Sequence, residues 1–208
     1  MPPSLPRLCA LTDRRLAGGM SHDRIAEAML RGGARWIQLR EKELRPGPFL
    51  AQAAVAAALA RAGRAILIVN DRVDLALAAG ADGVHVGRDD LPAEEARALL
   101  GAGRLVGVST HSVEEGIAAS RLPVDYVAIG PVFPTTTKKD TEPVVGLDAV
   151  TRLAGAIDLP VVGIGGIGPG NARSVLDAGA SAVAVISALY GAGSIEDGVA
   201  RMIEIVLG

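Results

Sequence analysis

The 208-residue sequence has few aromatic residues and no long apolar run. Phe, Trp and Tyr make up 2% of a chain that is 50% hydrophobic, so the core must consist of Ala, Val, Leu and Ile. Such a core suits parallel strands packed under Ala-rich helices. No apolar run is long enough to cross a membrane, and the first six residues do not lead into a signal peptide. We therefore expect a cytoplasmic protein with no membrane partner.

The chain also lacks an excess of positive charge and a second cysteine. It carries 21 basic and 23 acidic residues and a net charge of −2, which gives no positive field for nucleic acid. Any anion must therefore be held by local groups. Cys9 cannot form an internal disulfide and lies in an apolar run, so we expect it in the core. With no linker in the sequence, we expect a single catalytic domain over residues 1–208, and homo-oligomer formation stays open.

Short apolar runs alternate with Ala-rich segments of helical period along the whole chain. We predict eight strands, at 7–11, 35–39, 65–69, 83–86, 105–108, 124–129, 160–164 and 182–186. Predicted helices between them include 21–30, 47–61, 92–100, 113–120 and 171–178. Eight units of about 26 residues favour a compact (β/α)8 TIM barrel. An open doubly wound sheet is the alternative, because alternation alone does not establish closure.

The sixth strand leads into a loop rich in hydroxyls and ammonium groups. Thr135, Thr136 and Thr137 precede Lys138 and Lys139. Hydroxyl donors and positive charge packed this closely suit an anion such as phosphate or diphosphate. The alternative is a solvated surface loop.

The end of the second strand also carries polar residues. A period of two places Gln38, Arg40 and Lys42 on one side and Ile37 and Leu39 on the other. Cations that pointed into a packed barrel would be costly unless they met an anion. The alternative is that the strand stops early and these are rim residues in water.

Carboxylates follow the third and fourth strands. Asp71 ends one strand, and Asp89 and Asp90 follow the next. Carboxylates at neighbouring strand ends make a plausible Mg²⁺ site, since this ion completes its shell with water and substrate phosphate. Helix capping is the alternative for each of them, and Pro92 is typical of a first helical turn.

The fifth strand ends in Ser109, Thr110, His111 and Ser112. Ser112 and Glu115 have the spacing of a capping box, which indicates a structural role for Ser112. No Asp lies beside Ser109 that would complete a nucleophilic triad. The Ser109 hydroxyl is therefore better suited to donate a hydrogen bond to an anion. His111 is either an ordinary loop residue or an acid/base.

The seventh and eighth strands have the features of a phosphate cup. Gly165 and Gly166 let backbone N–H groups approach a ligand, or serve tight packing alone. Barrels often bind phosphate after these two strands, at the start of a short extra helix. The segment 187–190 has the length of such a helix.

Taken together, motifs at six strand ends resemble the thiamine phosphate synthase family. They are Gln38-Leu39-Arg40-Glu41-Lys42, Val69-Asn70-Asp71-Arg72-Val73-Asp74, His85-Val86-Gly87-Arg88-Asp89-Asp90, Ser109-Thr110-His111, the stretch 130–140 and Ile164-Gly165-Gly166-Ile167. The resemblance runs from residue 8 to about residue 188. It implies a TIM barrel that joins 4-amino-2-methyl-5-pyrimidinylmethyl diphosphate to 4-methyl-5-hydroxyethylthiazole phosphate, releasing thiamine monophosphate and diphosphate.

The resemblance also implies a role for individual residues. The pyrimidine diphosphate would be held by Gln38, Arg40, Lys42, Asn70, Ser109 and Lys138, among which Arg40, Lys42, Ser109 and Lys138 act in catalysis. Mg²⁺ would be held by Asp71 and Asp90, and the thiazole phosphate by Thr135, Thr137, Gly166, Ile186 and Ser187. The metal and the cations would stabilise the departing diphosphate, so that the C–O bond breaks to a pyrimidinylmethyl cation.

The sequence departs from the family at Arg88, where Gln is usual. The added charge beside Asp90 either contacts the diphosphate or points to solvent. The closest alternative function is a thiazole tautomerase of the same superfamily, with His111 as its proton-transfer group. The retention of Gln38, Arg40 and Lys42 argues against a one-substrate isomerase. An inactive protein that binds a thiamine precursor is the alternative from another class.

Overall fold

The computed structural model describes residues 5–135, 142–191 and 193–208. Eight parallel strands close into a barrel in chain order, each paired with its neighbours and β1 paired with β8. They are β1 (Leu8–Leu11), β2 (Trp36–Leu39), β3 (Ile66–Asn70), β4 (Gly83–Val86), β5 (Leu105–Thr110), β6 (Tyr126–Ile129), β7 (Val161–Ile164) and β8 (Ala182–Val185). The predicted (β/α)8 barrel is therefore confirmed, and the open sheet is wrong.

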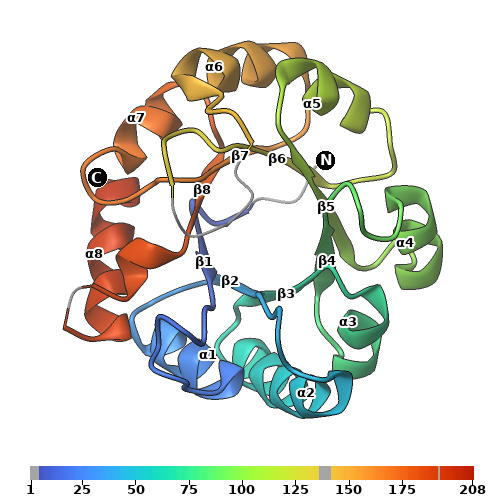
Figure 1. Cartoon of the computed structure of the whole chain (residues 1–208), viewed down its shortest axis with the longest axis vertical. Helices are drawn as coiled ribbons and strands as arrows, with labels where there is room; N and C mark the ends of the chain where they lie inside the picture. Colours follow the sequence, from blue (N-terminus) through green and yellow to red (C-terminus); the bar gives the residue numbers. More distant parts are fainter. Residues whose placement is uncertain (1–4, 136–141, 192) are drawn as a thin grey trace.

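Helices follow the strands and form the outer ring around the barrel (Figure 1). They are α1 (His22–Arg31), α2 (Pro46–Ala62), α3 (Val73–Ala79), α4 (Ala93–Leu100), α5 (Val113–Ala119), α6 (Gly146–Ala156), α7 (Ala172–Asp177) and α8 (Ile195–Leu207). The predicted extra helix is present as one 3-10 turn, η1 (Ser187–Leu189), between β8 and α8. No helix in the described part of the chain is long and apolar enough to span a bilayer.

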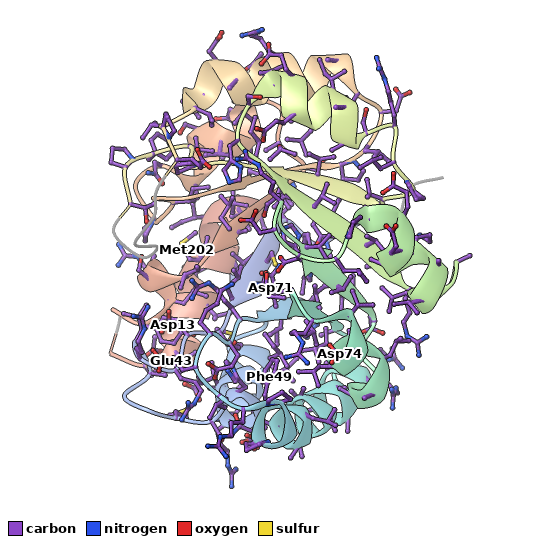
Figure 2. All side chains as sticks on the ribbon, turned by 45° about the vertical axis from the view of Figure 1, so that its right-hand side comes forward. Asp13, Glu43, Phe49, Asp71, Asp74 and Met202 are labelled. Atoms are coloured by element: carbon purple, nitrogen blue, oxygen red, sulfur yellow. The ribbon has the colours of Figure 1, made fainter. Side chains whose placement is uncertain are left out.

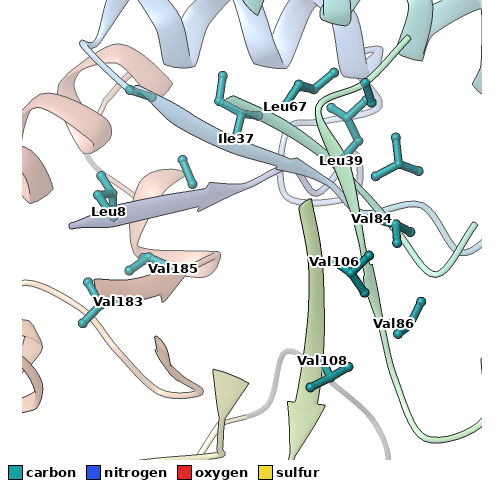
Figure 3. Packing of buried hydrophobic residues seen from close by; sticks show 14 of the residues in the cluster. Leu8, Ile37, Leu39, Leu67, Val84, Val86, Val106, Val108, Val183 and Val185 are labelled. Carbon is teal, nitrogen blue, oxygen red and sulfur yellow. The ribbon is translucent and has the colours of Figure 1, made fainter. Parts of the chain in front are cut away.

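Alternate residues of each strand face the two sides of the barrel wall. The outward side chains, such as Ile37, Leu39 and Val84, pack in one cluster with the helices (Figure 3). The inward ones form a separate cluster inside the barrel, in which Cys9 is buried as predicted. The near absence of large aromatic residues fits this arrangement, because Ala and Val let the helices approach the strands closely.

Two of the few aromatic residues fill the barrel interior. Trp36 on β2 and Tyr126 on β6 meet edge to face, with 5.1 Å between their ring centroids. Gly107 on β5 faces the same space, and a Cβ built there would overlap the Tyr126 ring. The absence of a side chain at Gly107 therefore makes room for the tyrosine below the barrel mouth.

Candidate functional site

A cavity of about 380 Å³ lies at the carboxyl ends of the strands, where parallel barrels carry their functional groups. The predicted site residues among its lining are Gln38, Arg40, Lys42, Asn70, Asp71, Asp90, Ser109, Thr135, Gly166, Ile186 and Ser187. The fold thus brings residues from seven strand ends and the following loops around one cavity. Thr137 and Lys138 lie outside the described residues.

The cations after β2 reach the cavity from a loop rather than from the strand. β2 ends at Leu39, which confirms the predicted range at this end, so Arg40 and Lys42 lie beyond the strand rather than on its inward side. The N–H of Arg40 donates to the Thr12 hydroxyl at 3.1 Å instead of continuing the ladder. The side chain of Arg40 is 16% exposed and that of Lys42 is 54% exposed. Of Gln38, Arg40 and Lys42, Gln38 alone belongs to the strand, and its side chain reaches the cavity from there.

Two carboxylates lie side by side on the neighbouring loops. Burial, with the adjacent Asp71 carboxylate adding to it, raises the pKa of Asp90. One oxygen of Asp71 accepts from Lys42 Nζ at 2.5 Å, and the other accepts from the Asn70 amide at 2.5 Å. Figure 2 shows Asp71 near the middle of the barrel, whereas Asp74 lies on α3 at the outer wall. Charges of both signs therefore converge at this point of the rim.

The alternative role of these carboxylates as helix caps is wrong. The residue at the N-cap of α3 is Arg72, and Pro92 occupies that position in α4. Asp71 instead has φ of 65°, a left-handed conformation that is uncommon for a residue with a side chain. Asp90 accepts from the Gly87 N–H at 2.7 Å and so closes the loop after β4. Backbone strain of this kind is typical of positions held for function.

The donor set at these loops fits Mg²⁺. Two carboxylates, Asp71 and Asp90, face a cavity broad enough for a phosphorylated ligand. Magnesium is commonly held by one or two carboxylates together with substrate phosphates and water. No group of three or more His, Cys, Asp or Glu side chains suited to a metal occurs among the described residues. The described residues therefore offer at most two such ligands, and the remaining positions around Mg²⁺ would be filled by water and substrate phosphate.

Ser109 is held by His85, for which the sequence alone predicted no role of its own. His85 on β4 places Nε2 2.8 Å from the Ser109 hydroxyl and Nδ1 3.1 Å from the Tyr126 hydroxyl. Burial lowers the pKa of His85 to about 4, so the imidazole is neutral at pH 7. The sequence offered one indication of this role. His85 lies between the outward residues Val84 and Val86, so its side chain must face the barrel interior.

The hydrogen-bond partners of His85 determine which of its ring nitrogens carries the proton. Within the described residues, Nδ1 of His85 is the acceptor that the buried Tyr126 hydroxyl reaches. Tyr126 therefore donates to Nδ1, and the remaining ring proton on Nε2 is donated to the Ser109 oxygen. The hydroxyl proton of Ser109 is then free to point into the cavity. This arrangement makes Ser109 a hydrogen-bond donor to a ligand rather than a nucleophile.

The next two residues after β5 are held by Glu115. The backbone N–H of His111 donates to a Glu115 carboxylate oxygen at 2.8 Å, and its Nδ1 lies 3.5 Å from the same oxygen. Ser112 caps α5 by accepting from the Glu115 N–H at 3.1 Å, which confirms its predicted structural role. His111 lines the cavity, so both of its predicted roles stay open.

Glycines and a short turn form the opposite end of the cavity. Gly165 and Gly166 have φ of 96° and 64°, and a Cβ on Gly166 would meet the Pro134 carbonyl oxygen at 2.5 Å. The backbones after β6 and β7 therefore approach closely only because Gly166 has no side chain. Ser187 opens η1 beside them, which is the arrangement predicted for a phosphate cup.

Arg88 is paired with acidic residues at the edge of the cavity. Its guanidinium donates to Glu115 at 2.8 Å and lies 3.5 Å from Glu142. Its side chain is 57% exposed. The added positive charge is therefore offset by two carboxylates and lies partly in solvent.

The chain is similar to known proteins in both sequence and structure. Residues 8–189 match the thiamine monophosphate synthase family. The chain is 50% identical over 182 residues to a thiamine-phosphate synthase from Roseiflexus castenholzii, covering 88% of this chain and 80% of the relative. Over 189 residues it is 46% identical to a thiamine-phosphate synthase from Methanoculleus marisnigri, covering 90% and 89%. The structure resembles a thiamine phosphate pyrophosphorylase from Pyrococcus furiosus, with a TM-score of 0.86, 36% identity and 97% of each chain covered.

Proposed function

The chain belongs to the thiamine monophosphate synthase family and is a transferase of thiamine biosynthesis, and we propose that it joins a pyrimidinylmethyl diphosphate to a thiazole phosphate. The products are thiamine monophosphate and diphosphate. The observation that carries the proposal is one cavity with anion-suited groups at two ends and a carboxylate pair at one of them. A reaction between two phosphorylated substrates needs two such ends within reach of each other.

The diphosphate end consists of the cations after β2 and the donors on β3 and β5. Arg40 and Lys42 supply positive charge, and Ser109 supplies a hydroxyl whose proton is directed into the cavity by His85. Asn70 lines the same wall, and Gln38 lies deeper, where it can orient the pyrimidine ring. Lys138 is the further cation that we assign to this end from the sequence.

Mg²⁺ belongs to the same end of the cavity. Asp71 and Asp90 would hold the ion, and when bound it supplies positive charge that neutralises the diphosphate oxygens. Lys42 pairs with Asp71. A bound diphosphate would therefore compete with this carboxylate for the lysine.

The bond-breaking step follows from the charges at this end. As the C–O bond of the pyrimidine substrate breaks, both electrons leave with the diphosphate, whose growing negative charge is stabilised by Arg40, Lys42 and Lys138. The pyrimidinylmethyl cation that remains is resonance-stabilised. The thiazole nitrogen captures it with its lone pair, so no general base is needed. This agrees with the donor role of Ser109 and with a neutral His85.

The thiazole phosphate end consists of the loop glycines and the first turn after β8. Gly166 brings its backbone to the ligand, and Ser187 and Thr135 bring hydroxyls. Ile186 adds an apolar contact, and Thr137 is assigned to this end from the sequence. These groups touch a phosphate that does not react, so they act in binding and orientation.

Omitting one substrate at a time tests the proposal against its rivals. Turnover that requires Mg²⁺ and both substrates supports the synthase. Isomerisation of a thiazole phosphate alone would support the tautomerase instead, with His111 as the first residue to substitute. Binding of either substrate without turnover would support a precursor-binding protein and contradict the proposal.

A further inference from the structure

A buried chain of hydrogen bonds connects α1, outside the barrel, to the loop that carries Arg40 and Lys42. The His22 side chain is fully buried. Its Nδ1 lies 2.7 Å from the Thr12 hydroxyl and its Nε2 lies 3.0 Å from a Glu41 carboxylate oxygen. The ring also packs edge to face on Phe49 of α2, with 5.2 Å between centroids. Figure 2 labels Phe49 among the helices on this side of the barrel.

The partners fix the protons in this chain. The ionised Glu41 carboxylate can only accept, so Nε2 of His22 carries the ring proton and donates it to Glu41. In the neutral ring Nδ1 then accepts from the Thr12 hydroxyl, whose oxygen accepts from the Arg40 N–H at 3.1 Å. Every polar atom of the His22 ring is satisfied in this neutral form, which agrees with the lowering of its pKa by burial.

Glu41 in turn binds the backbone of the loop that follows it. Its second carboxylate oxygen accepts from the N–H groups of Lys42, Glu43 and Leu44, at 2.6, 2.6 and 3.1 Å. Although burial by itself raises the pKa of Glu41, these bonds and the one from His22 lower it to about 2. One carboxylate therefore shapes the turn at residues 41–44, and His22 holds that carboxylate from behind.

We propose that His22 is a positioning residue for diphosphate binding, which fixes Arg40 through Thr12 and Lys42 through Glu41. The inference rests on the proposed function, since it takes diphosphate as the anion held by these two cations. His22 is not among the residues that line the cavity. Its effect reaches the ligand only through the backbone of the loop, which is what separates this role from a catalytic one.

The connection has two arms, the hydrogen bond from His22 to Glu41 and the one between His22 and Thr12. Two substitutions at His22 separate them. In His22→Gln an amide N–H lies near the position of Nε2 and can still donate to Glu41. In His22→Asn the shorter side chain leaves only an acceptor near Nδ1, for Thr12. We expect His22→Asn to bind inorganic diphosphate with Mg²⁺ about tenfold more weakly in calorimetry, because a charge-assisted hydrogen bond is lost. We expect His22→Gln to stay within about threefold of the wild type.

Ile25→Val is the matched control for stability, because Ile25 is a fully buried apolar residue of the same helix. It should lower the unfolding midpoint without changing diphosphate affinity. The KM for the pyrimidine substrate should rise in His22→Asn, while the KM for the thiazole phosphate stays unchanged. A merely structural role for His22 would move both constants or neither.

The inference is overturned if folded His22→Asn binds diphosphate like the wild type, or if Asn and Gln weaken binding equally. If His22→Asn does not fold, Thr12→Val asks the same question from the other arm, since it removes the acceptor of the Arg40 N–H. Normal diphosphate affinity in Thr12→Val would then overturn it. Failure of the wild type itself to bind diphosphate would contradict the proposed function and the inference with it.

Discussion

The burial of neutral His85 predicts that the fold loses stability in mild acid. Its imidazole is enclosed in the barrel between Ser109 and Tyr126, and its pKa is about 4 instead of 6.5. Below pH 6.5 the unfolded chain becomes protonated at this histidine, whereas the folded chain becomes protonated there only near pH 4. Folding is therefore fully supported above pH 6.5, and this support is lost as the pH falls towards 4.

The size of the effect follows from the lowering of the pKa. At about 1.4 kcal/mol for each pH unit, the change from 6.5 to about 4 corresponds to about 3 kcal/mol of unfolding free energy. His85 is fully buried, so solvent screening does not reduce this figure appreciably. Other acidic groups also titrate in this range. The quantity to compare is therefore the difference between the wild type and a variant without the histidine.

The assay is urea unfolding at pH 7, 5.5 and 4 for the wild type and for His85→Gln. Gln keeps a donor that can reach Ser109 and does not titrate. The wild type should lose about 3 kcal/mol more than the variant between pH 7 and 4. Parallel loss in both proteins would refute the conclusion that His85 is held neutral, and with it the donor role of Ser109.

Three further predictions concern the metal, the two anion ends and the barrel interior. Asp90→Ala should fold and lose about a hundredfold or more in turnover; near-normal turnover at saturating Mg²⁺ would remove Asp90 from the metal site. Lys138→Ala should lower kcat and pyrimidine affinity, whereas Ser187→Ala should mainly raise the KM for the thiazole substrate, and the reverse pattern would contradict the two ends. Gly107→Ala should cost about 3 kcal/mol or more in urea unfolding, since its Cβ overlaps the Tyr126 ring, and a stable variant would show that the ring can move.

The strands could be predicted from sequence because most are buried on both faces and therefore appear as short apolar runs. Their carboxyl ends were predicted to within one residue except at β5. The second strand stops at Leu39, as predicted, and the Arg40 N–H turns to Thr12. The fifth runs two residues further than predicted, to Thr110, because Ser109 and Thr110 pair with β6.

The candidate site was predictable where its residues follow neighbouring strands. Asp71 and Asp90 could be grouped on that basis, because parallel strand ends meet at one rim. The roles of His85 and His22 were not predicted, because each depends on a partner distant in sequence. His85 contacts Tyr126, and His22 contacts Glu41. A single histidine in an apolar strand carries no such signal by itself.

Counting both products of one reaction tests the central claim most directly. Purified protein is mixed with the pyrimidine diphosphate, the thiazole phosphate and Mg²⁺, and thiamine monophosphate and diphosphate are quantified in the same quenched samples. We predict equal amounts of the two products at every time point, and neither product when Mg²⁺ is removed by a chelator. Diphosphate released without thiamine monophosphate, or no product at all from folded protein, would contradict the assignment of this cavity to the coupling reaction.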